Sequence, residues 1–543
     1  MTAPVAELRA AVERAAASLR EGDGARPGAA PTLERPKKAE FGDYSTNAAL
    51  LLAPVLGEPP RDIAARLGDA LAEQLGGRLE RAEVAGPGFL NLFLSDAWYR
   101  EALEHVLAAG EGYGGGFAAP SERVNLEFVS ANPTGPLTVA GGRHAAYGDA
   151  LARLLEFAGH RVEREYYIND HGSQVRKLGE SIRARARGEE PPEDGYQGEY
   201  VAELAAAIPD AAEADPDELA RAGVEMMVER IRQTLERFRV RFDTWFSERR
   251  LHEAEPNPVE QHYAELEQVG HVYRSEGAVW LRTSAFGDDK DRVLRRRSGE
   301  HTYFAADVAY HEDKRERGYD RAIDVLGADH HGYVGRLQAA WQALGGEPQA
   351  LELIIMQFVN VLERGERASM SKRRGEFVTL DDLLDEIGVD AARFFLLQRS
   401  HDTPVDLDLD LAREQSAENP VYYVQYAHAR IASIRAKARE EGASASLEER
   451  ADVPLEPAER TLMLKLLAFP GEAEEAVERR APHRIAVYAL ELAQEFTAFY
   501  RDCRVVGAEP KPVESFRLAL CIACQRTIAR CLDLLGVEAP DSM

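Results

Sequence analysis

Two loops of this 543-residue chain carry residue types that suit phosphate chemistry. The first, residues 132–142, lies between a strand pattern and a helix pattern, so it offers free backbone N–H groups and the positive end of a helix dipole. The second, residues 369–375 (SMSKRRG), ends in glycine and brings Ser371 and Lys372 together with two further cations. Such a loop can stabilise charge that moves toward a leaving pyrophosphate. A plain tight turn and a solvated basic loop remain the alternatives for these two segments.

Two other groups contain residue types that metals prefer. His330 and His331 follow Asp329 at the end of an apolar strand pattern, and such a group is compatible with zinc. Three of the four cysteines share one helical face with Ile528 and Leu535, which favours a packed core helix because buried free cysteine behaves as a small hydrophobe. These are Cys521, Cys524 and Cys531. We expect no metal site, and the low cysteine content fits a reducing cytoplasm.

The elements around these loops alternate between strand and helix from about residue 120 to residue 400. The strand patterns cover residues 124–128, 161–168, 322–326 and 353–358. This order is typical of βαβ units in a parallel sheet, where ligands lie at the carboxyl ends of the strands. Three glycines at 114–116 predict a flexible joint before this region. Beyond residue 400, apolar residues at helical spacing predict a separate bundle of helices.

Length and composition limit the class of protein. A chain of 543 residues and 60.1 kDa exceeds what one hydrophobic core supports, so about two to four domains are expected. The apolar runs are all shorter than the roughly 20 residues that span a bilayer. The spacing of Leu8, Val12 and Ala16 predicts an amphipathic N-terminal helix, which differs from an export signal. The net charge of −27 argues against a nucleic-acid partner, because phosphate contacts are normally made by Lys and Arg. Local basic surfaces, such as residues 295–297 or 372–374, could still bind nucleic acid.

Five motifs occur in an order that resembles the catalytic core of arginyl-tRNA synthetases, which are class I aminoacyl-tRNA synthetases. They are VSANPTGP (129–136), YYINDHGSQ (166–174), TYFAADVAYH (302–311), GADHHGY (327–333) and SMSKRRG (369–375). Segments on either side resemble the N-terminal and anticodon-binding regions of the same family, so the resemblance covers nearly the whole chain. These are RPKKAEFGDYSTN (35–47), GPGFLNLFL (86–94), DAARFFLLQRS (390–400) and ENPVYYVQYAHARI (418–431).

The resemblance implies an α/β fold in three parts. A small N-terminal α/β added domain that contacts tRNA is expected at residues 1–110, and a Rossmann-like parallel-sheet catalytic domain with insertions at 120–400. A C-terminal all-α helix bundle at 401–543 would bind the anticodon. Within it, Tyr422 and Tyr426 lie one helical turn apart and are candidate platforms for unstacked bases, with internal packing as the alternative. The family resemblance also implies a cytoplasmic monomer.

The resemblance assigns substrate contacts as well. Tyr303 and Asp307 match a tyrosine and an aspartate that recognise the guanidinium of arginine, and a carboxylate holds that planar group through paired hydrogen bonds. Glu248 matches a second acid at the substrate, and Asn132 matches an asparagine at its amino-acid end. Contacts with ATP are implied for Gly141, His330, His331, Met370 and Lys372. The implied catalytic groups are Lys372, Ser371 and Thr138.

The first ATP-binding motif departs from the pattern of class I enzymes. These enzymes carry HxGH, whose imidazoles hydrogen-bond the phosphates, whereas residues 138–141 of this chain are TVAG. Loss of one such transition-state hydrogen bond typically costs about 2.7–4 kcal/mol. Our hypothesis is that Thr138, Arg143 and His144, together with Lys372, supply part of the lost stabilisation.

The predicted activity is ATP-dependent activation of L-arginine to arginyl-adenylate and transfer to the 3′ end of its tRNA, giving AMP and pyrophosphate. Magnesium would accompany ATP, and no tightly bound cofactor is implied. One alternative is a non-catalytic paralogue that binds tRNA, since both histidines of HxGH are replaced. Another is an adenylating ligase that acts on a different amino acid or acceptor, although Asp307 should prefer guanidinium.

Overall fold

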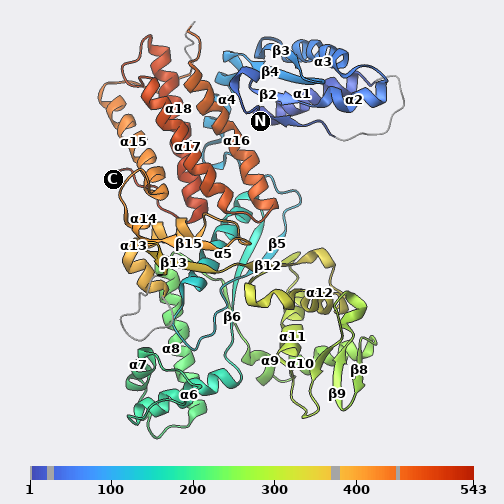
Figure 1. The fold of residues 1–543 in the computed structure, drawn as a ribbon, viewed down its shortest axis with the longest axis vertical. Coiled ribbons are helices and arrows are strands. Elements are labelled where there is room, and N and C mark those ends of the chain that lie inside the picture. The colour runs from blue at the N-terminus through green and yellow to red at the C-terminus, as the bar shows by residue number, and fades with distance from the viewer. Residues whose placement is uncertain (1–2, 21–29, 368–378, 448–452) are drawn as a thin grey trace.

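The computed structural model describes residues 3–20, 30–367, 379–447 and 453–543. The predicted basic loop with Met370, Ser371 and Lys372 lies outside these residues. Figure 1 shows an elongated molecule in which the N-terminal part projects from one end of a helical bundle and the sheet region lies at the other end. The N-terminal part and one lobe of the sheet region project toward the same side, so the molecule is concave there (Figure 1).

The N-terminal part packs helices on a small antiparallel sheet of order β1-β2-β4-β3. Its first helix buries Leu8, Val12 and Ala16, which confirms the predicted amphipathic helix. Ser95 caps the last helix of this part by accepting a hydrogen bond from the backbone N of Trp98 at 3.4 Å. The bounds are α1 (Pro4–Ser18), β1 (Leu33–Glu34), β2 (Tyr44–Thr46), α2 (Ala48–Leu56), α3 (Pro60–Leu75), β3 (Leu79–Ala85), β4 (Phe89–Leu94) and α4 (Asp96–Ala109).

A five-stranded parallel sheet of order β12-β11-β5-β6-β7 forms the middle of the molecule, which confirms the predicted α/β class. The chain leaves the middle strand to build one side of the sheet and then returns to build the other. A topological switch point, where ligands of such sheets bind, therefore lies at the carboxyl end of β5. The strands are β5 (Arg123–Glu127), β6 (Arg161–Ile168), β7 (Thr244–Ser247), β11 (Arg321–Gly327) and β12 (Leu351–Met356).

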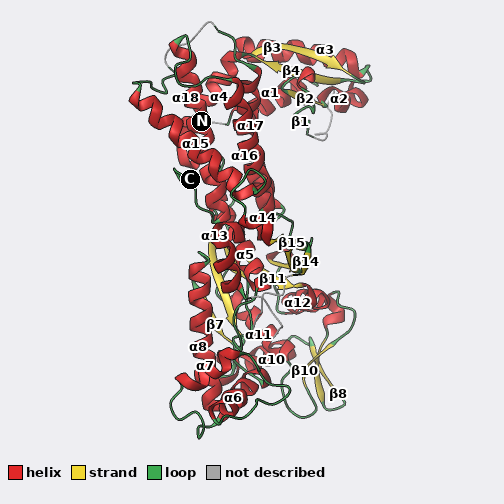
Figure 2. Ribbon diagram, turned by 60° about the vertical axis from the view of Figure 1, so that its left-hand side comes forward, coloured by secondary structure: helices red, strands yellow, loops and turns green. Residues whose placement is uncertain are grey.

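Helices cover this sheet, and two insertions extend from it as separate lobes (Figure 1). In Figure 2 the sheet lies between α8 and α11, and the antiparallel sheet β10-β9-β8 belongs to the second lobe. The first lobe contains α6 (Ser173–Ala186), α7 (Glu199–Ala207) and α8 (Pro216–Arg237). The second contains α9 (Arg249–Glu253), α10 (Pro258–Gln268), β8 (Val272–Ser275), β9 (Ala278–Leu281), β10 (Arg292–Arg295) and α11 (Tyr303–Glu316). In the sheet region, α5 (Val139–Ala158) connects β5 to β6, and α12 (Val334–Ala343) connects β11 to β12.

A short strand corrects the prediction that the chain beyond residue 400 is almost wholly helical. β15 (Val405–Asp408) pairs in parallel with β13 (Val359–Glu363), and β14 (Glu366–Arg367) completes this small sheet. Val405 and Leu407 are buried whereas Asp406 is exposed, which is the alternation of a half-buried strand. The neighbouring helices are α13 (Leu380–Leu396) and α14 (Leu409–Arg413).

The glycine-rich segment at 114–116 is packed, so the prediction of a flexible joint is wrong. A Cβ atom on Gly114 would lie 2.7 Å from Cδ1 of Phe469, and one on Gly115 would lie 2.7 Å from Cε2 of Phe157. The backbone N of Gly116 donates to the Phe157 carbonyl at 2.8 Å. Glycine is needed here because the backbone closely approaches two aromatic rings.

Four long helices form the C-terminal bundle, as predicted. Its apolar face includes the three cysteines of α18, which are free and buried, and this confirms a packed core helix. None of the helices in the described parts of the chain has the length and apolar character needed to cross a membrane. The bundle consists of α15 (Pro420–Glu440), α16 (Pro457–Glu478), α17 (His483–Asp502) and α18 (Lys511–Leu535).

Candidate active site

Several predicted site residues lie on segments that leave the sheet at its carboxyl edge. Asn132 and Thr138 follow β5, Glu248 follows β7, and His330 follows β11. These strands belong to one parallel sheet, so their carboxyl ends meet at one edge. The sheet therefore gathers residues that are far apart in the sequence.

The backbone is strained directly after β5. Val129 and Ser130 have φ values of 69° and 40°, a left-handed conformation that is uncommon for residues other than glycine. The Ser130 hydroxyl donates to Oε1 of Glu127 at 2.9 Å and accepts a hydrogen bond from the backbone N of Tyr167 at 3.1 Å. These bonds hold the strained turn, and such strain is often found where a fold positions functional groups.

Two acidic side chains lie at the site, and the carboxylate of Glu248 acts on that of Asp307. Glu248 is 4% exposed, and Asp307 lies in the second turn of α11. Burial, together with the carboxylates of Glu248 and Glu127, raises the pKa of Asp307 to about 6, although His311 and a hydrogen bond from Tyr333 act against this rise. A cationic ligand between the two acids would relieve their repulsion and favour the ionised form of Asp307.

A buried network of charges lies beneath Asp307. The Lys314 ammonium is fully buried and donates to Oε2 of Glu127 at 2.6 Å and to Oδ1 of Asp324 at 2.7 Å. One turn from Asp307, His311 contacts Oδ2 of Asp324 through Nε2 at 2.9 Å and the Asp307 carbonyl through Nδ1 at 2.7 Å. Burial lowers the pKa of His311, but the hydrogen bond and charge of Asp324 outweigh it, so the pKa is raised. The network thus fixes α11, and with it Asp307, to β5 and β11.

Tyr303 approaches the loop that follows β6, and Asn132 approaches the first turn of α6 directly after it. Tyr303 is 60% exposed, and its hydroxyl lies 3.7 Å from where a Cβ atom on Gly172 would stand. Asn132 donates through Nδ2 to Oε1 of Gln174 at 3.0 Å. The loop after β6 and the first turn of α6 therefore bring the predicted guanidinium contact and the predicted contact for the amino-acid end toward one another.

The phosphate side of the site begins at Thr138, which caps α5. Its Oγ1 accepts a hydrogen bond from the backbone N of Gly141 at 3.4 Å, and its backbone forms an antiparallel bridge with Thr379. The backbone N of Leu380 donates to the Leu137 carbonyl at 2.7 Å. Thr379 and Leu380, which follow the predicted basic loop in the sequence, therefore lie directly beside the altered TVAG motif.

Arg143 is not available to a ligand, so this part of our hypothesis is wrong. Its side chain is 1% exposed, and its guanidinium is surrounded by backbone carbonyls. Its role is therefore structural. The guanidinium donates to the carbonyls of Gln357 at 2.6 Å, Phe358 at 3.2 Å, Ser400 at 2.9 Å and Thr403 at 2.8 Å. The arginine thus joins the start of α5 to the segments that follow β12 and precede β15.

His144, the next residue of α5, has a free ring nitrogen. Burial and the nearby Arg143 charge lower its pKa to about 4, while the Val325 carbonyl and the charge of Asp329 oppose this change. Within the part of the chain that the structure describes, its buried Nδ1 atom has no hydrogen-bond partner. At neutral pH the imidazole is therefore uncharged, with an unpaired nitrogen in the first part of α5.

The other predicted ATP contacts have different surroundings. His330 and His331 lie exposed on the short helical turn η5 (Ala328–Tyr333), and Nε2 of His330 is 3.5 Å from Oδ2 of Asp329. A Cβ atom on Gly141 would lie 2.4 Å from Cδ1 of Leu137. The Leu137 side chain therefore occupies the space next to Gly141, where class I enzymes carry the second histidine.

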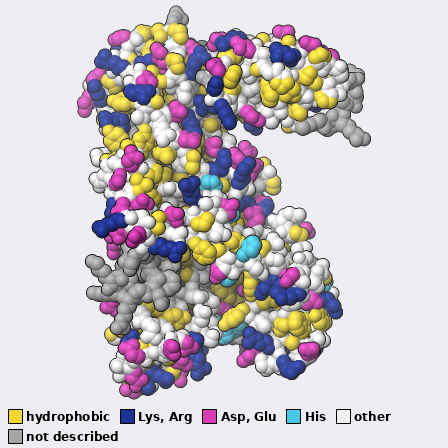
Figure 3. All heavy atoms as spheres, in the orientation of Figure 1, with side chains coloured by type: hydrophobic (Ala, Val, Ile, Leu, Met, Phe, Trp, Pro, Cys, Tyr) yellow, Lys and Arg dark blue, Asp and Glu magenta, His cyan; other side chains and the backbone are white. Residues whose placement is uncertain are grey.

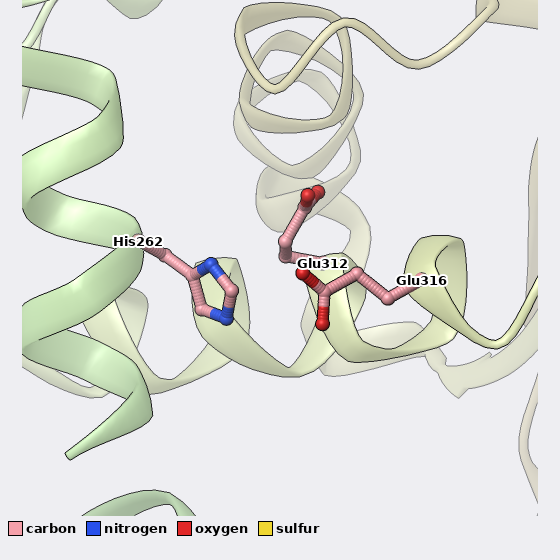
Figure 4. A group of neighbouring side chains, drawn as sticks. All are labelled: His262, Glu312 and Glu316. Atoms are coloured by element: carbon pink, nitrogen blue, oxygen red, sulfur yellow. The ribbon is translucent and has the colours of Figure 1, made fainter. Parts of the chain in front are cut away.

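A group of possible metal ligands lies between α10 and α11. His262, Glu312 and Glu316 bring their ligand atoms within 4.8 Å of one another (Figure 4). The carboxylate of Glu312, however, is already bound through both oxygens by Arg315. Positions 307 and 316 also fall on opposite faces of an α-helix, so the group faces away from the acidic site. We assign no metal ion to it.

On the bundle, Tyr422 and Tyr426 form a stacked pair. Their ring centroids are 6.3 Å apart and their planes differ by 12°, while Val424 and Ala427 face the core. Tyr426 is 42% exposed, and the Arg430 guanidinium donates to its hydroxyl and lies 5.2 Å from its ring centroid. Aromatic faces and a cation together suit unstacked bases.

Cationic and anionic side chains are interspersed on the face of the molecule shown in Figure 3.

Three residues near the acidic site were not predicted from the sequence. Asp170 follows β6 and is 5% exposed, Tyr333 hydrogen-bonds Asp307, and Lys314 occupies the buried network. Asp170 and Tyr333 lie within motifs that the sequence already singled out. The spacing of Asp307, His311 and Lys314 at i, i+4 and i+7 places them on one helix face and was an available signal.

Three family profiles match the chain. The arginyl tRNA synthetase N terminal domain matches residues 6–94, the catalytic domain of class I (R) tRNA synthetases matches residues 197–433, and the DALR anticodon binding domain matches residues 424–543. An arginine–tRNA ligase of Frankia alni is 48% identical in an alignment 527 residues long that covers 94% of each chain.

Solved structures agree with these matches. The arginyl-tRNA synthetase of Thermus thermophilus superposes with a TM-score of 0.75 at 26% identity, with 99% of both chains covered. That of Plasmodium falciparum superposes with a TM-score of 0.73 over all of both chains. Its identity of 17% means that this second likeness shows the fold alone.

Proposed function

Because the chain belongs to the arginyl-tRNA synthetase family, we propose that it performs the reaction after which the family is named. It activates L-arginine with ATP to arginyl-adenylate and transfers the arginyl group to the 3′ end of its tRNA, releasing AMP and pyrophosphate. The observation in the site that carries this proposal is that the charge of buried Glu248 raises the pKa of Asp307, a repulsion that a bound cation would relieve.

Arginine recognition is assigned to four residues. Glu248 and Asp307 hold the guanidinium, since its planar fork of N–H donors matches carboxylates better than a lysine ammonium does. Tyr303 lies at the start of the same helix as Asp307 and packs near the loop after β6. Asn132, held by Gln174, binds the amino-acid end of the substrate.

In the activation step, the arginine carboxylate attacks the α-phosphate of ATP while the bond to pyrophosphate breaks, so no covalent enzyme intermediate forms. The protein positions the reactants and stabilises developing charge. The start of α5 directs its dipole toward the phosphates, with Gly141, His330 and His331 as ATP contacts. Met370, Ser371 and Lys372 act from the segment that precedes Thr379 in the sequence, and Thr379 pairs with Thr138. Magnesium accompanies ATP and offsets its triphosphate charge.

The missing histidines are replaced in part by Thr138 and His144, together with Lys372. Thr138 is supported by its hydroxyl at the start of α5 and by its backbone bridge to Thr379. His144 lies in the first part of α5, and its unpaired Nδ1 would donate to a phosphate in the neutral tautomer that carries the proton on that nitrogen. Arg143 has no part in this replacement because its guanidinium is bound to carbonyls.

The tRNA contacts two parts of the chain besides the sheet region. The stacked Tyr422 and Tyr426 bind bases of the anticodon, and the N-terminal part holds another region of the tRNA on the concave side. Cytoplasmic location and a monomeric state complete the proposal. The proposed domain limits remain 1–110, 120–400 and 401–543, although β15 pairs with β13 and so joins residues 405–408 to the middle domain.

Aminoacylation of tRNA tests this function. We expect the protein to attach labelled arginine, but not labelled lysine, to arginine tRNA in the presence of ATP and magnesium. Binding of the same tRNA is measured in parallel. If the folded protein binds tRNA but charges it with neither amino acid, the activity is absent and the non-catalytic paralogue is the better account. Charging with lysine at a similar rate would instead contradict the assigned specificity.

A further inference from the structure

We propose that Asp170 is the positioning residue of the arginine pocket, because it holds Glu248 in place. This inference rests on the proposed function. Asp170 belongs to the YYINDHGSQ segment, and none of the substrate contacts assigned above lies in that segment. Its side chain is 4% exposed and lies at the end of β6, next to the strand that precedes Glu248.

The hydrogen bonds of Asp170 enclose Glu248 on both sides. Oδ2 accepts from the Ser247 hydroxyl at 2.6 Å and from Nε of Arg249 at 3.1 Å. Oδ1 accepts from the backbone N of Arg249 at 3.0 Å. The backbone N of Glu248 itself donates to the Ile168 carbonyl at 3.0 Å. Both neighbours of Glu248 are thus bound by one buried carboxylate, while its own backbone continues the β6–β7 pairing.

The turn that contains Asp170 is also tied to the other predicted arginine contacts. Gly172, with φ of 94°, lies near the Tyr303 hydroxyl, and Gln174 accepts a hydrogen bond from Asn132. The loop after β6 and the first turn of α6 therefore contact the surroundings of Glu248, Tyr303 and Asn132. A displacement of this loop would alter several arginine contacts at once.

Asp170 acts through Glu248 and not as a ligand itself. Each of its carboxylate oxygens is already an acceptor for hydrogen bonds from Ser247 or Arg249, and the group is almost fully buried. Charge-assisted hydrogen bonds of this kind are strong and directional, so they restrict the path of the backbone at Glu248. A carboxylate held in advance binds a guanidinium with less loss of conformational entropy.

Steady-state aminoacylation of the full-length chain tests this role. In Asp170→Asn, an NH2 group replaces one acceptor oxygen, so bonds from Ser247 or Arg249 are lost. We expect the KM for arginine to rise roughly 10- to 100-fold, as expected for loss of hydrogen bonds to a charged group. The KM for ATP and kcat should stay within about twofold, because the phosphate side is not touched. Ser247→Ala removes one of the same bonds and should give a smaller rise in the same direction.

The matched control is Asp243→Asn. Asp243 accepts a hydrogen bond from the backbone N of Arg164 at 2.9 Å, so it joins the same two strands at their opposite end. We expect this variant to keep the wild-type KM for arginine. Thermal unfolding of each variant identifies any that fails to fold, and in that case Ser247→Ala decides the question.

The outcomes separate this inference from the proposed function. If the wild-type protein does not charge arginine, the function itself fails. If it does, and Asp170→Asn and Ser247→Ala leave the KM for arginine unchanged, only the role of Asp170 is contradicted. Equal changes in the KM values for arginine and ATP would also contradict it, because they would indicate a general loosening of the site.

Discussion

The arginine side and the phosphate side of the site are built in different ways. On the arginine side, Glu248 is buried, and Asp307 stands on a helix that a network of buried charges fixes to the sheet. On the phosphate side, Thr138 stands where class I enzymes carry a histidine, and His330 is exposed. The two sides lie at the same edge of one sheet, yet only the arginine side matches the family pattern at every assigned residue.

This difference suggests how the two tasks depend on individual side chains. Recognition of a guanidinium needs carboxylates in fixed positions, because an unpaired buried charge is costly. Stabilisation of a triphosphate is shared among a helix dipole, backbone N–H groups, cations and magnesium, so the loss of one donor lowers the rate without abolishing the chemistry. We therefore expect substitutions on the arginine side to change specificity and stability, and those on the phosphate side to change turnover.

The largest effect is expected at Lys314. Lys314→Met leaves the buried carboxylates of Glu127 and Asp324 without their cation, so the free energy of unfolding should fall by about 3–5 kcal/mol. Urea unfolding, followed by circular dichroism, measures this change. Lys177→Met, which removes a surface pair with Asp194, should leave the unfolding transition where it is. Equal stability of the Lys314 variant and the wild type would show that the network does not fix the arginine side.

A slightly smaller effect is expected at Thr138. If its hydroxyl takes over a histidine's role, Thr138→Ala should lower kcat by roughly 100-fold, the size of a lost transition-state donor. Thr138→Ser keeps both the hydroxyl and the helix cap, so it should remain close to wild type. The KM for arginine should change little in either variant. Unchanged turnover of Thr138→Ala would remove Thr138 from the catalytic groups.

Restoring the family motif should have the opposite effect. The double variant Thr138→His with Gly141→His should raise kcat by about tenfold or more, since each imidazole adds a phosphate donor. A side chain at position 141 must displace Leu137, whose Cδ1 atom lies 2.4 Å from the required Cβ position. Gly141→Ala controls for this crowding. A folded double variant without any gain would mean that the phosphate side of this chain is not limited by the missing histidines.

The pH dependence gives the smallest and most selective effect. Since the pKa of Asp307 is raised to about 6 in the free protein, the acid is protonated below that pH and cannot pair with guanidinium. We expect kcat/KM for arginine to be flat above about pH 6 and to fall roughly tenfold per pH unit below it. The corresponding profile for ATP should lack this step. A profile for arginine that stays flat down to pH 5 would contradict an ionised Asp307 as the ligand.

Much of the fold could be predicted from local patterns. The strand pattern at residues 161–168, which follows a helix pattern, predicted β6 with its observed bounds, and the helical spacing of Leu8, Val12 and Ala16 predicted α1. β15 was missed because Val405 and Leu407 alternate over only four residues before a helix begins. The glycines at 114–116 looked flexible, since the sequence does not show the aromatic rings that approach them.

The sequence predicted the residue types of the site but not the hydrogen bonds that hold these residues in place. Motifs identified Asp307 and Glu248 as substrate contacts, and these remain proposals. The roles of Asp170 and Arg143 depend on bonds to residues far away in the sequence, such as Ser247 and Ser400. Only the folded chain shows that the Arg143 guanidinium donates its hydrogen bonds to four backbone carbonyls. For this reason the sequence suggested the wrong role for Arg143.

The most direct test of the account is aminoacylation by Asp307→Asn, with the KM values for arginine and ATP measured separately. The variant keeps the size of the side chain but removes the charge that would face the guanidinium. We predict that kcat/KM for arginine falls by roughly 100- to 1000-fold, as for loss of one partner of a buried charge pair, while the KM for ATP stays within about twofold. If the variant charges tRNA with arginine as well as the wild type does, the arginine side has been assigned to the wrong residues.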